Sequence, residues 1–484
     1  MEANWNLETI EPYIRREISG TVYKNVSGFH RFFPDIKGPE WDCALVHDSS
    51  CSCEARASES LNTRAWPKLP NQRAVINWFR NFNEHLVGGR TRFYSAKDTP
   101  MEDSESGRKC DLFLSSCDNG EEFEPKKGQP FSMYAPWVVG ELKESPQEDC
   151  KHRIVVQVVG YAREIFGIQV CRRFVHGFTI CGDIFRCYLF DRVGVSISTS
   201  FRIGTNEKTL KLFTRILLGY SKMQPEDLGF DPNYKAADGE PFIPTKSHPI
   251  PAYMEFQNHK YHLSSKLFHQ SSVVSRGTLC WLAKDEAENE CVVKDSWRCK
   301  GRTSEGDLLF KAREKKVWGV VECRQHGDVI VGNDVDEIMS NIRQGLSYEA
   351  ASQVTVLAML SDRFRSLSTT TSSGHLSSGS LKRKLSQDHG SSTPKRSKSL
   401  DRPSAQSPPG RDRTHTCLII YTIGENICEF LSVKELLEAL RDAIKCTFSA
   451  LNFFLLSTSN YPQVINRYGR MLGFCIAMSR SIIS

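Results

Sequence analysis

The sequence predicts an α+β protein with two folded parts and a long insertion. The chain has 484 residues, of which 39% are hydrophobic, and this is enough to build two or three cores. Between residues 71 and 235, stretches with helical spacing of apolar residues alternate with short runs rich in Val, Ile and Phe. A second set of such runs begins at residue 267, and residues 366–412 contain no Phe, Trp or Tyr.

The composition limits the class of protein. The 17 cysteines have no regular spacing, and the N-terminal residues lack the basic and apolar regions of a secretory signal. We therefore expect reduced thiols, an intracellular protein and no membrane span, because no apolar run is long enough. The formal charge of +6 comes mainly from residues 366–412, which contain eight Lys and Arg residues and three Asp residues. We expect no nucleic-acid partner for the folded parts, since their charge is nearly balanced.

In the first part of the chain, a segment without a clear secondary-structure pattern precedes segments whose patterns predict helices and strands. Residues 1–70 combine aromatic, charged and proline residues without periodicity, so an irregular or helical extension is expected there. The elements expected after it are an amphipathic helix (Pro70 to Val87), two strands (Lys109 to Leu114 and Trp137 to Lys143), a helix (Asp149 to Phe166), a hairpin (Arg173 to Cys181 and Ile184 to Asp191) and a helix (Glu207 to Tyr220).

The order of these elements, and the polar residues on them, resemble the core of PD-(D/E)XK nucleases. Asp111 lies on the first strand, Glu141 and Lys143 on the second, and Gln157 and Tyr161 on the helix. The resemblance implies that the two carboxylates hold Mg²⁺ and that the lysine positions or deprotonates a water. Paired strands also carry solvated charges on one face without any catalytic role, so a purely structural interpretation stays open.

The hairpin carries a second resemblance. Its sequence, Arg173-Phe-Val-His-Gly-Phe-Thr-Ile-Cys181 followed by Phe190-Asp-Arg-Val-Gly194, is similar to the signature of the fungal-type protein kinase family. In that family a nuclease-like region and this hairpin precede a kinase catalytic domain. The resemblance implies a PD-(D/E)XK-like α/β domain over 71–235 and a kinase-like N-lobe over 236–365.

The expected N-lobe contains a lysine in a kinase-like setting. Glu290-Cys-Val-Val-Lys294 is typical of a β-branched strand that ends at a lysine, and Ser275-Arg-Gly-Thr278 is typical of a turn before it. These residues match the kinase lysine that pairs with the phosphates of ATP and the family's turn in place of the glycine-rich loop. A surface strand with a solvated lysine is the alternative.

Further residues complete this resemblance. Glu305 matches the glutamate that pairs with the lysine, and Thr303 or Ser304 can cap the helix that it opens. The family therefore implies ATP and Mg²⁺ as cofactors, with Gly277, Lys294 and Glu305 as binding residues. Residues 331–361 are expected to contain another helical stretch.

The insertion at 366–412 is expected to be disordered, because its polar and basic composition cannot bury enough apolar surface. Its two basic clusters, Lys382–Lys384 and Lys395–Lys398, resemble a bipartite nuclear-import signal. A solubilising basic linker is the alternative interpretation.

The end of the chain departs from the family pattern. Residues 413–445 are expected to supply the strand that leads into the adenine hinge and the helix after it. Residues 446–484 form an atypical tail, and neither His-Arg-Asp nor Asp-Phe-Gly occurs anywhere in the chain. The catalytic base and both magnesium ligands are therefore missing, as is most of the C-lobe. A frameshift or retained intron would explain the change, and a truncated pseudokinase is the alternative.

The leading hypothesis is thus a fungal-type protein kinase family member. The family implies ATP binding and Ser/Thr phosphorylation, but this chain should not transfer phosphate at a useful rate. One alternative is a non-catalytic pseudokinase scaffold that binds protein partners, which the sequence does not identify. The other is a Mg²⁺-dependent nuclease.

Overall fold

The computed structural model describes residues 7–33, 66–86, 89–119, 122–356, 412–421, 432–434, 437–442 and 444–445. The predicted disordered insertion, apart from its last residue, lies outside the described residues, as do both basic clusters and the tail 446–484. No helix within the described ranges is long and apolar enough to span a bilayer.

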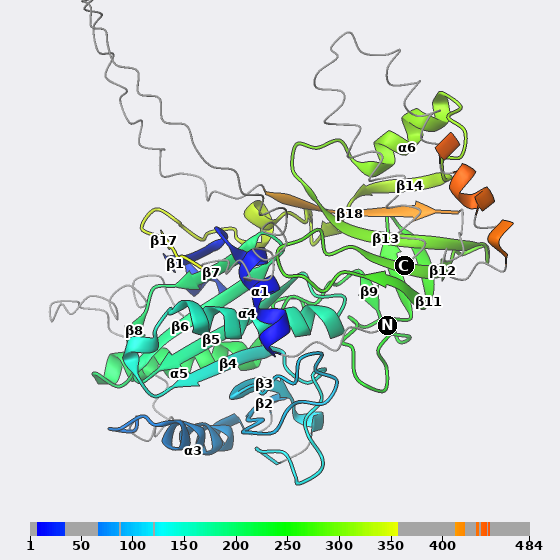
Figure 1. Cartoon of the computed structure of the whole chain (residues 1–484). Coiled ribbons are helices and arrows are strands. Elements are labelled where there is room, and N and C mark those ends of the chain that lie inside the picture. Colours follow the sequence, from blue (N-terminus) through cyan, green and yellow to red (C-terminus); the bar gives the residue numbers. More distant parts are fainter. Residues whose placement is uncertain are drawn as a thin grey trace, which may run out of the picture.

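A nine-stranded mixed sheet forms the first part of the molecule (Figure 1). Its order is β17-β1-β7-β6-β5-β4-β3-β2, with β8 paired to β6. The β1–β7 and β4–β5 pairs are parallel and the others antiparallel. The strands are β1 (Val22–Val26), β2 (Thr91–Tyr94), β3 (Leu112–Ser116), β4 (Val138–Lys143), β5 (Phe174–Cys181), β6 (Ile184–Asp191), β7 (Gly194–Ser198), β8 (Phe201–Arg202) and β17 (Ser352–Gln353).

Helices cover both faces of this sheet, because successive strand residues point to opposite sides. Phe113 belongs to a core cluster with residues of α1 (Leu7–Ile18) and α4 (His152–Ile168), whereas its neighbour Leu112 belongs to a cluster with residues of α3 (Gln72–Asn83) and α5 (Glu207–Lys222). The short 3-10 helices of this part are η1 (Phe29–Phe32), η2 (Glu84–Leu86), η3 (Cys117–Asn119) and η4 (Pro146–Glu148). We call this three-layered part, formed by the described residues from 7 to 222 together with β17, the sandwich.

A seven-stranded antiparallel sheet forms the second part, which lies above the sandwich in Figure 1. Its order is β14-β18-β13-β12-β11-β10-β9, and we call it the second sheet. Leu309 of α6 (Glu305–Glu314) packs on one face, and the opposite face has a separate core. The strands are β9 (Tyr234–Lys235), β10 (Tyr253–Phe256), β11 (His259–His269), β12 (Leu279–Lys284), β13 (Glu290–Cys299), β14 (Cys323–Asp328) and β18 (Arg413–Ile420).

The chain returns to the sandwich after β14. A small hairpin, β15 (Ile330–Val331) with β16 (Asp334–Val335), leads to one π-helical turn, η5 (Ile338–Ile342), whose ends are buried in a core of the sandwich. Strand β17 then pairs with β1. The sequence predicted a helical stretch within 331–361, and in the described part, 331–356, the helical segment is the short η5.

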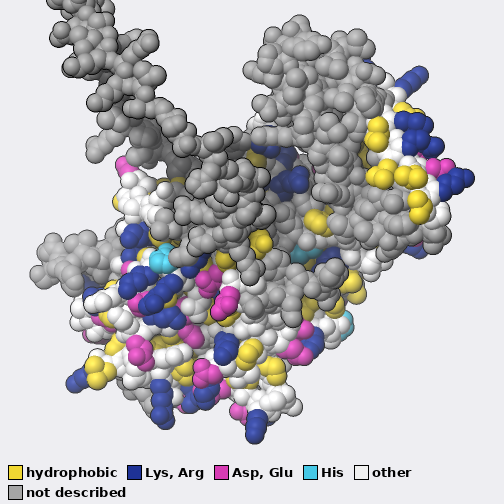
Figure 2. Space-filling model, in the orientation of Figure 1, with side chains coloured by type: hydrophobic (Ala, Val, Ile, Leu, Met, Phe, Trp, Pro, Cys, Tyr) yellow, Lys and Arg dark blue, Asp and Glu magenta, His cyan; other side chains and the backbone are white. Residues whose placement is uncertain are grey.

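The predicted α+β class is confirmed. The hairpin turns at the predicted position, between Cys181 and Ile184, and α6 begins at the predicted Glu305. One local prediction is wrong, because Lys294 lies in the middle of β13 rather than at its end. Figure 2 shows Lys and Arg side chains interspersed with Asp and Glu over the described surface of the sandwich on this face.

Candidate functional site

Lys294 and Glu305 form a close ion pair between β13 and α6. Lys294 Nζ donates to the two carboxylate oxygens of Glu305 at 2.7 and 3.0 Å. The side chains are 10% and 19% exposed, so water screens their attraction only in part. Ser304 fixes the start of α6, since its Oγ accepts from the Asp307 backbone N–H at 3.0 Å. The structure thus brings the two predicted residues together.

The turn between β11 and β12, residues 270–278, lies beside this pair. The Gln270 backbone N–H donates to the Thr278 carbonyl at 2.9 Å and closes the turn. Gly277 has a φ of +52°, and a Cβ there would lie 2.6 Å from Nε of Arg192. The glycine was predicted as a cofactor contact. In the structure it is buried, and the missing side chain makes room for an arginine of the sandwich.

A pocket of about 320 Å³ lies between the turn and Lys294. Two buried polar atoms in its wall, Thr278 Oγ1 and His269 Nε2, have no hydrogen-bond partner among the described residues. Burial lowers the pKa of His269 to about 3, so its ring is neutral. The lining residues are Phe268, His269, Gln270, Ser271, Ser272, Arg276, Thr278 and Lys294. A lysine, an arginine and several hydroxyl groups suit an anionic ligand.

The residues predicted as a nuclease-like site also lie together, at one end of β4. Tyr161 Oη lies 2.8 Å from Glu141 Oε2, and Gln157 Nε2 donates to Tyr161 Oη at 3.1 Å. Lys143 Nζ forms an ion pair with the other oxygen of Glu141. Asp111 is tied to the same strand, because its Oδ2 accepts from the backbone N–H after Glu141 at 2.9 Å.

Burial controls the charges of this cluster. It raises the pKa of Glu141, which is 0% exposed, to about 8, and the neighbouring Asp111 carboxyl adds to the effect. Burial also raises the pKa of Asp111. For Lys143, burial alone would lower the pKa, but Glu141 raises it above its usual value. The ammonium of Lys143 occupies one oxygen of Glu141, so a divalent cation bound there would have to displace it.

One comparison with known proteins decides the family. A family model described as fungal protein kinase matches residues 109–452, which is more than half of the chain. The chain belongs to this family. No curated protein matches it. The matched region begins just before β3 and includes Lys294 and Glu305, so the fungal protein kinase match spans both the sandwich and the second sheet.

In this fungal protein kinase family member, a buried ionic network joins the two parts. Arg173, which directly precedes β5, donates to both oxygens of Asp336 at 2.6 and 2.8 Å. His415 of β18 donates from Nδ1 to Asp336 at 3.0 Å and from Nε2 to Asp295. Burial would lower the pKa of His415, but Asp295 and Asp336 raise it to about 10. Asp295 directly follows Lys294, so the network reaches the strand that carries this lysine.

Sequence reasoning missed this network, because its members come from distant parts of the chain. Asp231, Asp295 and His415 offer ligand atoms within 4.8 Å of one another, which is close enough for a metal ion. Both ring nitrogens of His415 are engaged by carboxylates, however, so we assign an imidazolium in an ion-pair network to this position.

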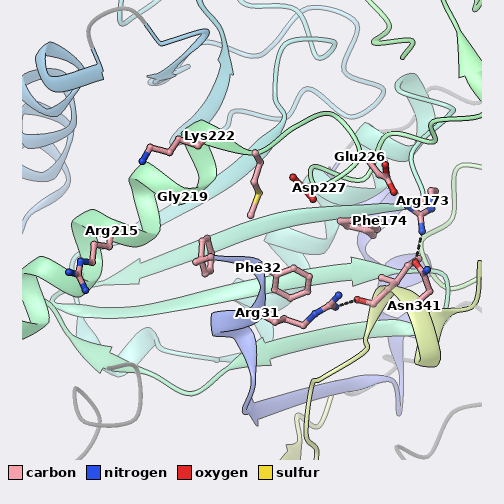
Figure 3. A pocket seen from close by; sticks show the side chains of 13 residues that line it. Arg31, Phe32, Arg173, Phe174, Arg215, Gly219, Lys222, Glu226, Asp227 and Asn341 are labelled. Atoms are coloured by element: carbon pink, nitrogen blue, oxygen red, sulfur yellow. Dashed lines mark hydrogen bonds between the residues drawn. The ribbon is translucent and has the colours of Figure 1, made fainter. Parts of the chain in front are cut away.

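A second cavity, of about 320 Å³, lies on the sandwich beside the network (Figure 3). Arg173 donates to Asn341 Oδ1 at 2.8 Å, and Arg31 donates to the Ile342 carbonyl at 2.7 Å. The Arg31 guanidinium lies 4.7 Å from the centre of the Phe32 ring, and Figure 3 shows both side chains at the cavity. The cavity is therefore closed on one side by η5, the turn that follows the network.

Proposed function

We propose that this member of the fungal protein kinase family binds ATP in the pocket beside Lys294. The observation that carries the proposal is the Lys294–Glu305 pair beside a pocket whose wall holds unpartnered polar atoms. Protein kinases hold the phosphates of ATP with a lysine of the third strand, which pairs with a glutamate of the following helix. The pair between Lys294 on β13 and Glu305 on the following helix, α6, supports the proposal because it resembles this arrangement.

Side chains, rather than glycine backbone, would contact the phosphates. Gly277 faces Arg192 instead of the pocket, whereas Thr278 and Arg276 line it together with Lys294. The Thr278 hydroxyl can donate to a phosphate oxygen, and a charged donor such as Arg276 makes a stronger hydrogen bond than a neutral one.

The proposal covers nucleotide binding and not phosphoryl transfer. No carboxylate occurs among the described residues that line the pocket, and Glu305 is engaged by Lys294. Mg²⁺ therefore finds no acidic ligand there, although the family implies it. The sequence also contains neither His-Arg-Asp nor Asp-Phe-Gly, which supply the catalytic base and a magnesium ligand in kinases.

Binding of a fluorescent ATP analogue, with competition by ATP, tests the proposal. Lys294→Met keeps the aliphatic stem but removes the charge, and we expect at least about tenfold weaker binding. Lys284→Met is the matched control, because Lys284 lies on the adjacent strand β12 with its side chain 49% exposed. If the wild type binds no nucleotide, the proposal fails and the non-catalytic scaffold with protein partners is favoured.

A Mg²⁺-dependent nuclease is the second candidate, favoured by the proximity of Asp111, Glu141, Lys143, Gln157 and Tyr161. Asp111 and Glu141 would hold the metal, which would take the place of the Lys143 ammonium beside Glu141. Incubating DNA and RNA with the protein and Mg²⁺ or Mn²⁺ tests this candidate. Glu141→Gln should abolish cleavage, whereas the exposed Glu144→Gln should not. Uncut substrate with the wild type contradicts it.

Nuclear import through the basic clusters at Lys382–Lys384 and Lys395–Lys398 is a separate proposal. Replacing the basic residues of both clusters with glutamine should exclude a fluorescently tagged chain from the nucleus. An unchanged distribution would favour the solubilising linker.

A further inference from the structure

The turn beside the nucleotide pocket is inserted into the sandwich. Val273, near the middle of the turn 270–278, is 0% exposed. It belongs to the same core cluster as Ile14 and Ile18 of α1 and Phe166 of α4. A turn between two strands of a sheet normally lies in solvent, since its backbone groups need water. Here its apolar side chain is part of a buried core in the other part of the molecule.

Two hydrogen bonds reinforce this contact. Oε1 of Glu17, in the last turn of α1, accepts from the Val274 backbone N–H at 2.8 Å. Arg192, which follows β6, donates from a terminal guanidinium nitrogen to the Ser272 carbonyl at 2.7 Å. The sandwich thus holds backbone groups of the turn on both sides of Val273.

Arg192 is itself held rigidly. Its side chain is 2% exposed, and its guanidinium lies 3.9 Å from the centre of the Phe166 ring. Gly277 packs directly against it. Movement of the turn away from the sandwich would therefore expose Val273, break two hydrogen bonds and uncover a buried arginine.

The opposite side of the same turn forms the pocket. Ser272, Arg276 and Thr278 line it, and Lys294 lies across from them on β13. The Arg276 carbonyl also accepts from the Trp297 backbone N–H at 2.7 Å, which fixes the turn on the strand of Lys294. The turn is therefore held between the sandwich and β13, with its polar side chains at the pocket.

We propose that Glu17 and Arg192 are positioning residues for the nucleotide pocket, so that the sandwich sets the affinity for ATP through the turn 270–278. The inference rests on the proposed function. In protein kinases, the loop at this place covers the phosphates of ATP. Here its backbone is held by residues 80 and 257 positions away in the sequence. By linkage, bound nucleotide must strengthen the contact between turn and sandwich as much as this contact strengthens binding.

Glu17 allows a clean test, because two substitutions separate its hydrogen bond from its charge. Glu17→Ala removes the acceptor of the Val274 N–H, and Glu17→Gln keeps an acceptor oxygen. Glu11→Ala is the matched control on the same helix, since Glu11 is 38% exposed and pairs with Arg15. The full chain is used throughout, and the probe is the fluorescent ATP analogue.

We expect about five- to tenfold weaker binding for Glu17→Ala, because affinity falls with the fraction of molecules in which the turn is placed correctly. Glu17→Gln should restore binding to within about twofold, and Glu11→Ala should leave it unchanged. Hydrogen exchange without nucleotide should accelerate at Val274 in Glu17→Ala alone. If Glu17 had only a structural role, Glu17→Ala would lower the stability of the protein, but Glu17→Gln would not restore binding and exchange would not accelerate at Val274 alone.

The outcomes separate the two proposals. If the wild type binds ATP, Lys294→Met does not, and Glu17→Ala binds like the wild type, the inference is wrong and the proposed function stands. If the wild type binds no ATP, the proposed function fails and the inference falls with it. Should Glu17→Ala not fold, Val273→Ala, which shortens the side chain in the core, replaces it with the same expected loss of affinity.

Discussion

Replacing His415 with glutamine tests the ionic network between the sandwich and the second sheet. His415 is 2% exposed, and its ring stacks on that of Trp297 with 4.4 Å between the ring centres. The ring lies between the carboxylates of Asp336 and Asp295. Glutamine has a similar length and can donate one hydrogen bond, but it carries no charge. Arg173 would still pair with Asp336, whereas Asp295 would lose its ion-pair partner among the described residues.

The size of the effect follows from the pKa of His415, which is raised from 6.5 to about 10. A folded-state pKa above the unfolded value stabilises the protein fully below the unfolded pKa, and this stabilisation is lost as the pH rises through the folded pKa. At pH 7 this increase in pKa corresponds to a stabilisation of about 4 kcal/mol. Breaking a buried ion pair by removal of one partner costs about 3–5 kcal/mol, which agrees.

Urea unfolding of the wild type and His415→Gln, followed by hydrogen exchange in β13 and β18, measures this effect. The stability difference should be largest near pH 6 and shrink towards pH 10. His262→Gln is the control, since His262 is exposed on β11 of the same sheet. A difference that stays constant over this pH range would show that His415 is not the charged member of the network.

Three other substitutions test single contacts. Gly277→Ala should lower the melting temperature more than Gly301→Ala. Both glycines have a left-handed φ, +52° and +78°. A Cβ at position 277 would lie 2.6 Å from Arg192 Nε, whereas a Cβ at position 301 would face open space. Equal losses would contradict the packing argument. Ser304→Ala should lower the free energy of unfolding, measured in a thermal or urea melt, by about 1 kcal/mol and should weaken binding of the ATP analogue. Ser304→Asp should restore both. If the affinity stays unchanged, the start of α6 does not contribute to the pocket. The pKa of Glu141, raised by burial from 4.5 to about 8, means that its ionisation opposes folding. The stability of the wild type relative to Glu141→Gln, measured in urea, should therefore fall as pH rises from about 4.5 to about 8, and a flat difference would contradict the raised pKa.

The sequence predicted those elements whose local signals agree with their environment. The hairpin of β5 and β6 turns at Gly182, whose φ of +61° suits glycine, between two runs of apolar residues. Helix α6 starts where Ser304 can cap it, and this start carries Glu305 to Lys294. Such features depend on a few neighbouring residues, so they can be predicted from a single sequence.

Other elements were missed because tertiary contacts decide them. In strand β11, apolar and polar residues do not alternate regularly, and most of its residues are exposed or half-buried. Strand β1 is stabilised by pairing with β7 and β17, which lie far from it in the sequence. The one π-helical turn after residue 336 lies between two long-range ion pairs, that of Asp336 with Arg173 and that of Arg343 with Asp191. No spacing rule connects residues more than 150 positions apart, so these ion pairs could not be predicted.

The same long-range contacts bear on how the fold serves a nucleotide site. Arg173, Asp336 and His415 are each no more than 3% exposed, and a buried charge without a partner is strongly destabilising. Arg173 belongs to the sandwich and His415 to the second sheet, so neither part can keep its charges paired without the other. Val273 links the turn to the sandwich in the same way, since it is buried in a core cluster of the sandwich. Strand β13 and the turn opposite it, which together enclose the pocket, are therefore both fixed from outside the sheet that carries Lys294.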